Sequence, residues 1–379
     1  MLRLLSLSCF LSLSSVTLGY ALVRDYSGAH FFDDKQGNPL WNFYDSWDNL
    51  TLGDVWWLNR SEAFAQRLAY LNERNQIVMR VDNSAFVPLN EKRNSVRIES
   101  RHWYGVGSLW IVDIAHVPYG CSVWPAFWTY GEKWPNDGEI DILEAINLQT
   151  TNQMALHTLP GCHHSAPPNQ KGVDDDPDCS TPAGCVVHES SPNSFGTGFN
   201  NVGGGVWATQ FDVSGIYIWF WTRNSVPASI TQVTASSAVD VSTWGPPSAS
   251  YPATTCDITE FFGAQRLVFD ITLCGNWAGE DKNYLPTCGG AGPAGKCYLD
   301  NVIGAGSPKY DQAYFEVNYL RVYTTGLPTP TPTGGINNVG SVLPSQRKLQ
   351  NAGVPSYLQS LQFLSLGVIT CLSLLCGLW

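Results

Sequence analysis

The stretch that decides the fold is WPNDGEIDILEAIN, at residues 134–147 of a 379-residue chain. It places three carboxylates, Glu139, Asp141 and Glu144, within six positions. On a β-strand Glu139 and Asp141 point to one face and Glu144 to the other, because side chains alternate along a strand. One extra residue after Asp141, accommodated as a β-bulge, returns Glu144 to the shared face. The pattern therefore predicts a bulged strand with one acidic face.

The apolar members of this stretch predict where the strand meets the core. We expect the bulge around Ile142 and Leu143, with Ile140 and two of Ile142, Leu143 and Ala145 packed against the interior. Burying three carboxylates in a core would cost too much free energy, so the acidic face must be solvated or functional. A solvated acidic edge strand is the alternative to a functional site.

Three carboxyls on one face have a specific chemical use. Two carboxyls about 5 Å apart form the site of a retaining glycosidase, in which one attacks the sugar and the other protonates the leaving oxygen. A third carboxyl between them, Asp141, can hydrogen-bond the nucleophile and raise the pKa of the acid so that it stays protonated. We therefore predict catalysis at Glu139, Asp141 and Glu144.

Tryptophans near the acidic stretch predict a carbohydrate ligand. Pyranose rings expose apolar C–H faces that stack on flat aromatic rings. A single tryptophan is more often a core residue, and we place Trp110, Trp219 and Trp221 in the core because they lie on predicted strands. The candidate sugar-stacking residues are Trp124, Trp128, Trp134 and Trp277.

Most of the chain has the composition of a turn-rich β protein. Only 14% of residues are charged, whereas Gly (35), Pro (23) and Trp (15) are abundant, a profile that suits strands better than helices. Short β-branched and aromatic runs predict strands at residues 77–81, 95–98, 108–114, 216–221, 267–273 and 315–323. So many short strands favour an all-β fold, an antiparallel sandwich, in one domain over residues 20–325.

The sequence over residues 120–147 closely resembles the catalytic strand of glycoside hydrolase family 16, in its bulged, laminarinase-like branch. Further matches lie at residues 94–98, 156–158, 203–207, 219–223, 274–279 and 314–323. The resemblance covers nearly the whole domain, from residue 26 to residue 323. It implies a concanavalin A-like jelly roll, with two antiparallel sheets and a glucan cleft across the concave face.

The resemblance also implies a role for each candidate residue. Glu139 matches the family nucleophile, Asp141 its electrostatic assistant and Glu144 its acid/base. Residues that line the family's sugar subsites match Trp128, His157 and Trp277. His157 has the alternative of a structural histidine whose ring nitrogens are satisfied within the fold.

The activity that the resemblance implies is that of a retaining endo-β-1,3(4)-glucanase acting on cell-wall or storage glucan without a cofactor. A cell-wall glucan transglycosylase would use the same residues, with a sugar hydroxyl in place of water. A lectin-like wall-binding module would keep the aromatic residues and lose the acids, all of which are present here. Loops around the cleft set the linkage preference, which the sequence leaves open.

No metal is expected in the site. Three consecutive Asp at residues 174–176 lie near His163 and His164, which suggests a metal site. A solvated loop between cysteines is the favoured interpretation, because nothing orders these ligands. Some family members hold a structural calcium on the convex face, but its ligands are not identifiable in this sequence.

The net charge of −11 repels phosphate backbones, so nucleic acid is excluded as a partner. We expect a monomer whose partner is a β-glucan polysaccharide. Of 11 cysteines, Cys9, Cys371 and Cys376 lie in the terminal segments, which leaves eight in the domain. An even number predicts disulfides in an oxidising compartment, although the sequence does not determine their pairing. Asn49 and Asn59 begin glycosylation sequons.

The two ends of the chain predict secretion and attachment to the cell surface. Residues 1–19 combine Arg3, an apolar run and small residues, as a secretory signal peptide does. A Thr/Pro-rich linker at residues 326–350 precedes a tail at residues 351–379, in which Asn351, Ala352 and Gly353 stand before a spacer and an apolar end. This layout predicts a glycolipid-anchor signal, and a transmembrane helix is the alternative.

Overall fold

Two antiparallel sheets of eight strands each carry the fold, in a computed structural model that describes residues 19–165, 167–232 and 238–326. The sheet that contains the acidic stretch, here called the acid-bearing sheet, has the strand order β14 (Val173–Asp174), β15 (Cys185–His188), β13 (Gln153–His157), β12 (Glu139–Glu144), β11 (Val123–Gly131), β19 (Gln265–Leu273), β9 (Arg97–Ser100) and β2 (Trp41–Phe43). The other, here called the outer sheet, has the order β18 (Ala249–Pro252), β17 (Gly215–Thr222), β16 (Gly205–Asp212), β10 (Ser108–His116), β21 (Tyr314–Thr324), β6 (Ile77–Arg80) and β5 (Ala69–Leu71), and β1 (Ala21–Ser27) pairs with β21. This is the predicted all-β architecture, and it agrees with a jelly roll.

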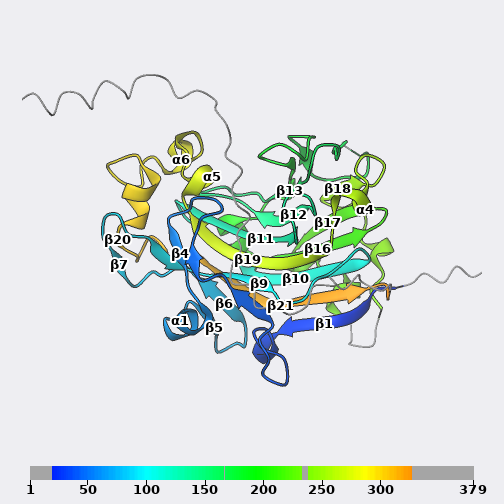
Figure 1. Cartoon of the computed structure of the whole chain (residues 1–379), viewed down its shortest axis with the longest axis horizontal. Helices are drawn as coiled ribbons and strands as arrows, with labels where there is room; N and C mark the ends of the chain where they lie inside the picture. The colour runs from blue at the N-terminus through cyan, green and yellow to red at the C-terminus, as the bar shows by residue number, and fades with distance from the viewer. Residues whose placement is uncertain (1–18, 166, 233–237, 327–379) are drawn as a thin grey trace, which may run out of the picture. The chain divides into compact units, whose positions relative to one another are not determined.

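Smaller elements connect the two sheets. A three-stranded sheet joins β3 (Ser46–Trp47), β4 (Val55–Trp57) and β8 (Arg93–Ser95), and a two-stranded one joins β7 (Phe86–Val87) and β20 (Gly304–Ala305). The α-helices are short: α1 (Arg60–Ala65), α2 (Gly196–Asn201), α3 (Ala228–Thr231), α4 (Ile258–Phe261), α5 (Gly275–Ala278) and α6 (Asp281–Cys288). The other helical turns are η1 (Gly28–His30), η2 (Arg223–Ser225), η3 (Val241–Thr243) and the π-helix η4 (Tyr298–Val302). Helices α5 and α6 lie together beyond the end of β19 (Figure 1).

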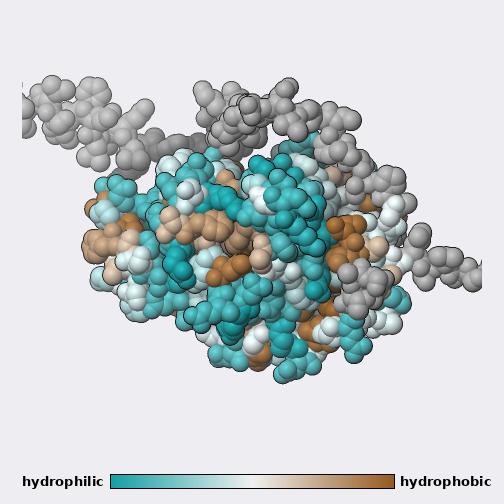
Figure 2. Space-filling model, turned by 90° about the horizontal axis from the view of Figure 1, so that it is seen from below, coloured by the Kyte–Doolittle hydropathy of each residue, from teal (hydrophilic) through white to brown (hydrophobic). Residues whose placement is uncertain are grey.

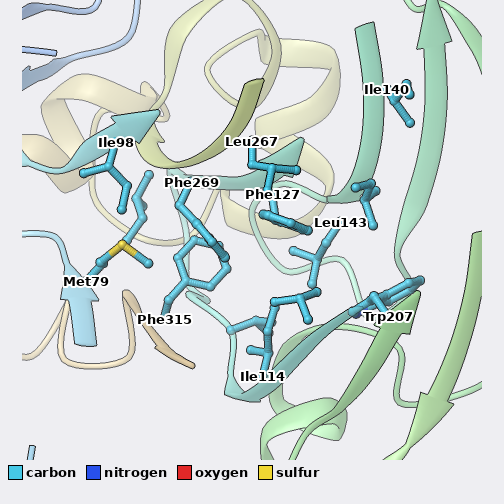
Figure 3. Close-up of a cluster of buried hydrophobic side chains, with 14 of the residues drawn as sticks. Met79, Ile98, Ile114, Phe127, Ile140, Leu143, Trp207, Leu267, Phe269 and Phe315 are labelled. Carbon is cyan, nitrogen blue, oxygen red and sulfur yellow. The ribbon is translucent and has the colours of Figure 1, made fainter. Parts of the chain in front are cut away.

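The main core is an aromatic and aliphatic layer between the two sheets. Phe127 and Phe269, from adjacent strands of the acid-bearing sheet, stack with ring centroids 4.4 Å apart. Phe269 also meets Phe315 of the outer sheet edge to face, with centroids 5.5 Å apart. Figure 3 shows these side chains pointing toward one another together with Ile114 and Leu143. Such contacts lock the two sheets in one relative position, because close-packed side chains tolerate little sliding.

A second apolar cluster covers the outer sheet on its other face. Trp219 and Trp221 are buried there, and each meets Trp244 edge to face, with ring centroids 5.3 and 5.2 Å apart respectively. Trp110 lies in the main core instead. All three tryptophans that we predicted to be core residues are therefore buried, but two of them are not between the sheets.

Five of the six predicted runs each form one strand. Four of these strands extend one or two residues beyond the predicted run, and the fifth ends one residue early. The run at residues 95–98 is the exception, because Ser95 ends β8 and Arg97 begins β9. Between them, Val96 accepts a hydrogen bond from the Ile271 N–H of β19. The chain thus passes from the three-stranded sheet into the acid-bearing sheet within this run, and periodicity alone does not reveal such a crossing.

The eight cysteines of the domain form four disulfides, as their even number predicted. The pairs are Cys121–Cys288, Cys162–Cys256, Cys179–Cys185 and Cys274–Cys297. Cross-links of this kind stabilise mainly by restricting the unfolded chain, and more so when they close long loops. The first pair closes the longest loop, since its cysteines are 167 residues apart.

The surface is mostly hydrophilic. In the view of Figure 2, hydrophobic residues form separate patches within a hydrophilic surround. Among the helices of the described residues, none has the length and apolar character needed to cross a bilayer. The predicted linker and tail, at residues 327–379, and most of the predicted signal peptide lie outside the described residues.

Candidate active site

Strand β12 presents its three acids on one face because a bulge interrupts its pairing. Glu139 and Asp141 take regular partners on β11, but the next β11 residue pairs with Leu143. Ile142 is thus the extra residue, and it returns Glu144 to the face of the other two acids. The pairing of β12 with β13 also shifts by one residue between Asp141 and Glu144. The bulge predicted from the sequence is confirmed.

The opposite side of β12 anchors the strand in the core. Ile140, Ile142, Leu143 and Ala145 are each at most 1% exposed. Each of the three larger side chains, Ile140, Ile142 and Leu143, contributes roughly 1.5–3 kcal/mol relative to an exposed one. A rotation of the strand that turned the acids inward would lose this contribution, so apolar burial fixes the direction in which the carboxyls point.

The carboxyls lie close together. One ligand atom from each of Glu139, Asp141 and His157 lies within 4.8 Å of the other two. His157 pairs with Glu139 across the β12–β13 ladder, and its Nε2 lies 3.1 Å from Oδ2 of Asp141. The histidine therefore contacts a carboxyl of the acidic cluster and is not an isolated structural residue.

Burial raises the pKa values of these three carboxyls. Asp141 is 3% exposed, and both glutamates are only partly exposed. Loss of hydration raises the pKa of Glu139 to about 8, and the neighbouring Asp141 adds to this rise, while His157 and a hydrogen bond from Trp134 oppose it. The pKa values of Asp141 and Glu144 are raised mainly by the same loss of hydration. The cluster therefore holds fewer than three negative charges at neutral pH, and at least one carboxyl keeps its proton.

Trp124 and Trp277 flank Glu144. The Trp124 indole Nε1 donates a hydrogen bond of 2.8 Å to Oε1 of Glu144. The ring of Trp277, which lies on α5, meets the Trp124 ring edge to face, with centroids 5.2 Å apart. Helix α5 starts next to the Cys274–Cys297 disulfide, which ties this segment to the chain before η4. These two predicted sugar-stacking residues therefore lie at the Glu144 end of the site.

Trp128 extends the site over β19. It pairs with Asp141 on one side, and its Nε1 donates a hydrogen bond of 3.0 Å to Oδ1 of Asp270. The Arg97 guanidinium lies 3.6 Å from the other oxygen of Asp270, and its centre is 4.9 Å from the Trp128 ring. Burial raises the pKa of Asp270 to about 6, and Arg97 opposes that rise. Arg97 and Asp270 thus fix the orientation of the Trp128 indole.

Sequence analysis did not identify Arg97 and Asp270. The available signal was a single carboxylate, Asp270, inside the otherwise apolar run 267–273, which is a costly place for an unpaired charge. Its partner Arg97 lies in the predicted strand at residues 95–98, and nothing in that run points to a contact with residue 270. Trp134, the remaining predicted residue, lies in the loop between β11 and β12 and is 57% exposed.

The acidic run at residues 174–176 is not the solvated loop that we predicted, because Asp174 lies in β14 and pairs with β15, but its three carboxyls still do not gather into one site. Asp174 lies 2.7 Å from His164 Nε2, and Asp175 lies 3.2 Å from His188 Nε2. Asp176 accepts hydrogen bonds from the Asp178 N–H and the Thr181 hydroxyl. Within the described part of the chain, the grouping close enough to share a metal ion is Glu139, Asp141 and His157.

The arrangement can perform acid–base and nucleophilic chemistry on a sugar. It combines a carboxyl that retains a proton, a second carboxyl on the same face, and flat aromatic rings next to them. Asp141 between them couples their ionisation, because its charge raises the pKa of both glutamates.

Comparison with known proteins agrees with this chemistry. Residues 41–323 match the family model described as "XgeA-like, catalytic GH16 domain". A probable endo-1,3(4)-beta-glucanase of Aspergillus fumigatus is 38% identical over 315 residues, which cover 81% of this chain and 46% of the relative. The chain thus spans about half the length of several curated relatives that it matches.

Two solved structures are similar over most of the described chain. An elongating family 16 beta-1,3-glucosyltransferase has a TM-score of 0.72 and 36% identity, and the match covers 80% of this chain and 100% of that one. Laminarinase 16A from Phanerochaete chrysosporium, solved with beta-glucans in its donor and acceptor sites, has a TM-score of 0.72 and 33% identity, with 80% and 99% covered.

Because the pKa values of these buried acids are raised, we predict that their contribution to the free energy of unfolding falls as pH rises. A carboxyl whose folded pKa lies above its unfolded value of about 4 holds a proton in the folded state that the unfolded chain has lost. The folded state is therefore favoured at low pH and loses that advantage as pH rises toward the raised pKa. We expect Asp141→Asn to be more stable than the wild type at pH 8 by about 1–3 kcal/mol, and to lose this gain near pH 4.

Urea unfolding of both proteins at the two pH values measures this difference. Asp257→Asn is the matched control, because hydrogen bonds from Thr259 lower the pKa of this exposed carboxyl and its contribution to stability has the opposite pH dependence. If Asp141→Asn changed the free energy of unfolding equally at pH 4 and pH 8, the raised pKa of Asp141 would be contradicted.

Proposed function

Because the chain belongs to glycoside hydrolase family 16, we propose that it is a retaining endo-β-1,3(4)-glucanase with Glu139 as nucleophile and Glu144 as acid/base. The observation that carries the proposal is the bulge at Ile142, which turns both glutamates to one face of β12 with Asp141 between them. Double displacement requires two carboxyls about 5 Å apart, too close to admit a water molecule between them, and long glutamate side chains on a shared face can converge in this way.

The reaction proceeds in two steps. The Glu139 carboxylate attacks the anomeric carbon while the glycosidic bond breaks, and Glu144 gives its proton to the leaving sugar oxygen. Glu144, now ionised, then takes a proton from water, whose oxygen attacks the anomeric carbon and releases Glu139. Burial near Asp141 keeps Glu144 protonated for the first step, because two adjacent buried carboxyls resist ionising together.

The aromatic residues support a glucan substrate. Trp124, Trp128 and Trp277 lie beside the acids, on β11 and on α5, and offer faces or edges to pyranose C–H groups. The names of the relatives, endo-1,3(4)-beta-glucanase and laminarinase, support β-1,3 linkages, with mixed linkages also accepted. The partner that we propose is therefore β-glucan of a cell wall or a storage polysaccharide.

We predict that Glu139→Gln and Glu144→Gln each lose at least about 100-fold in laminarin hydrolysis, since each removes a separate carboxyl role. With azide and a dinitrophenyl laminaribioside, Glu144→Ala should form the β-azide, because azide takes the place of water in the second step. Glu139→Ala should form the α-azide, because azide takes the place of the missing nucleophile. Reducing-sugar assays and NMR of the products measure both results.

Glu62→Gln, a change at an exposed acid on α1, is the matched control and should retain full activity. Substantial laminarin hydrolysis by Glu139→Gln would contradict the nucleophile assignment. An α-azide from Glu144→Ala would contradict the double displacement.

A second candidate function is glucan transfer, in which a sugar hydroxyl takes the place of water. The similarity to an elongating beta-1,3-glucosyltransferase, at 36% identity over the whole of that chain, favours this alternative. The same acids would serve both reactions, and the outcome depends on how well acceptor sugars exclude water from the glycosyl-enzyme.

Hydrolysis and transfer differ in the source of the oxygen in the product. We expect laminari-oligosaccharides digested in oxygen-18 water to give shorter products labelled at their new reducing ends. Mass spectrometry measures both the label and the chain length. Unlabelled products that are longer than the starting oligosaccharide would instead assign the enzyme to the transferases.

We also propose that the domain acts outside the cell, held at the surface by a glycolipid. Four disulfides support an oxidising compartment. The signal-like residues 1–19 and the tail at residues 351–379 support secretion and anchoring. Tyr20 is buried and bridges Val239, which agrees with signal cleavage directly before it.

The anchor proposal predicts that phospholipase treatment of expressing cells releases active enzyme into the supernatant, because the lipid is then the sole membrane attachment. Glucanase activity in the supernatant measures this release, and untreated cells are the control. Peptides that extend through Leu366 to Trp379 in the mature protein would contradict the anchor.

A further inference from the structure

The bulge in β12 is bridged by the side chain of Asn152. This residue lies directly before β13, opposite the interruption of the β12–β13 pairing. Its Nδ2 donates a hydrogen bond of 3.0 Å to the carbonyl oxygen of Ile142, the extra residue. Its Oδ1 accepts a hydrogen bond of 2.9 Å from the backbone N–H of Glu144. One side-chain amide thus takes the place of the backbone ladder across the bulge.

Asn152 is itself held in place. Its backbone N–H donates a hydrogen bond of 3.0 Å to the Ser194 hydroxyl, and its carbonyl accepts one of 2.9 Å from the Glu189 N–H. The residue is fully buried. Four hydrogen bonds to one buried residue leave its amide no freedom to turn, so the amide presents its donor and acceptor in a fixed direction.

The two bridged backbone groups belong to the part of β12 that decides where Glu144 points. Without a partner, each of these two backbone groups would be left without its hydrogen bond, at a cost in free energy. A regular ladder would restore those bonds only by removing the bulge, and a one-residue slip turns every following side chain to the other face. Glu144 would then point toward the core. The amide of Asn152 therefore favours the bulged register over the regular one.

We propose that Asn152 is a positioning residue for the acid/base Glu144, an inference that rests on the proposed glycosidase function. Asn152 touches neither the substrate nor the reacting atoms, and it acts by holding the backbone on both sides of the bulge. Its loss should therefore impair the steps that need Glu144 and spare those that do not.

A pair of substrates separates these steps. Laminarin needs a proton from Glu144 for bond cleavage, whereas a dinitrophenyl laminaribioside has a leaving group that departs without one. We expect Asn152→Ala to lose about 100-fold in kcat/KM on laminarin, the size that a misplaced catalytic group costs, with little loss on the dinitrophenyl substrate. Azide should also increase its turnover and give the β-azide, as for a variant that lacks the acid/base.

Asn200→Ala is the matched control. Asn200 bridges the backbone of Val117 in the same manner, since its Oδ1 accepts from the Val117 N–H at 2.9 Å and its Nδ2 donates to the Val117 carbonyl at 3.1 Å. It borders the end of β10 in the outer sheet and not the acidic cluster. Asn200→Ala should lose stability while the ratio of the two substrate activities stays at the wild-type value.

Equal losses on both substrates by Asn152→Ala, or no loss on either, would overturn the proposal. Where the alanine variant does not fold, Asn152→Asp keeps the acceptor for Glu144 and the volume but loses the donor to Ile142, and the same change in substrate ratio is expected from it. Wild-type protein that fails to cleave laminarin would contradict the proposed function itself, and this inference with it.

Discussion

The structure depends on one constraint, which is that strand β12 must bury an apolar face and present three carboxyls on the other. Strict alternation cannot satisfy both demands, because Glu139 and Glu144 are an odd number of residues apart. The extra residue at Ile142 solves the conflict, and it is buried itself, so the bulge costs little apolar contact. The two sheets and the core that fixes their distance support this one irregular strand.

The same burial that orients the acids also sets their chemistry. Partial removal from water raises the pKa values of the two glutamates and of Asp141, and the charge of Asp141 raises those of the glutamates further. Hydrogen bonds from tryptophan indoles and the proximity of His157 then limit the rise on the two glutamates. A network of Asp270, Arg97 and Trp128 continues from this cluster across β11, β19 and β9. Packing and electrostatics are therefore not separate properties of the site.

Much of this could be predicted from the sequence, because its strongest signals are local. The shared face of the acidic stretch and the need for a bulge both follow from the period of a strand. Three features could not be predicted: the pairing of the cysteines, the partnership of Arg97 with Asp270, and the bridge that Asn152 makes. Each joins residues far apart in the chain or uses a side chain in place of the backbone, and the spacing of residues carries no information about such contacts.

The linked disulfides around Trp277 have a consequence for how the domain withstands a proteolytic cut. Cys274 pairs with Cys297, and Cys288, which lies between them, pairs with Cys121 beside β11. The two cross-links therefore interlock along the sequence. A protease that cuts once between Cys274 and Cys288 would open the segment that carries Trp277, yet both new ends would stay attached through covalent bonds. The domain can thus be nicked on this side without being divided into separate fragments.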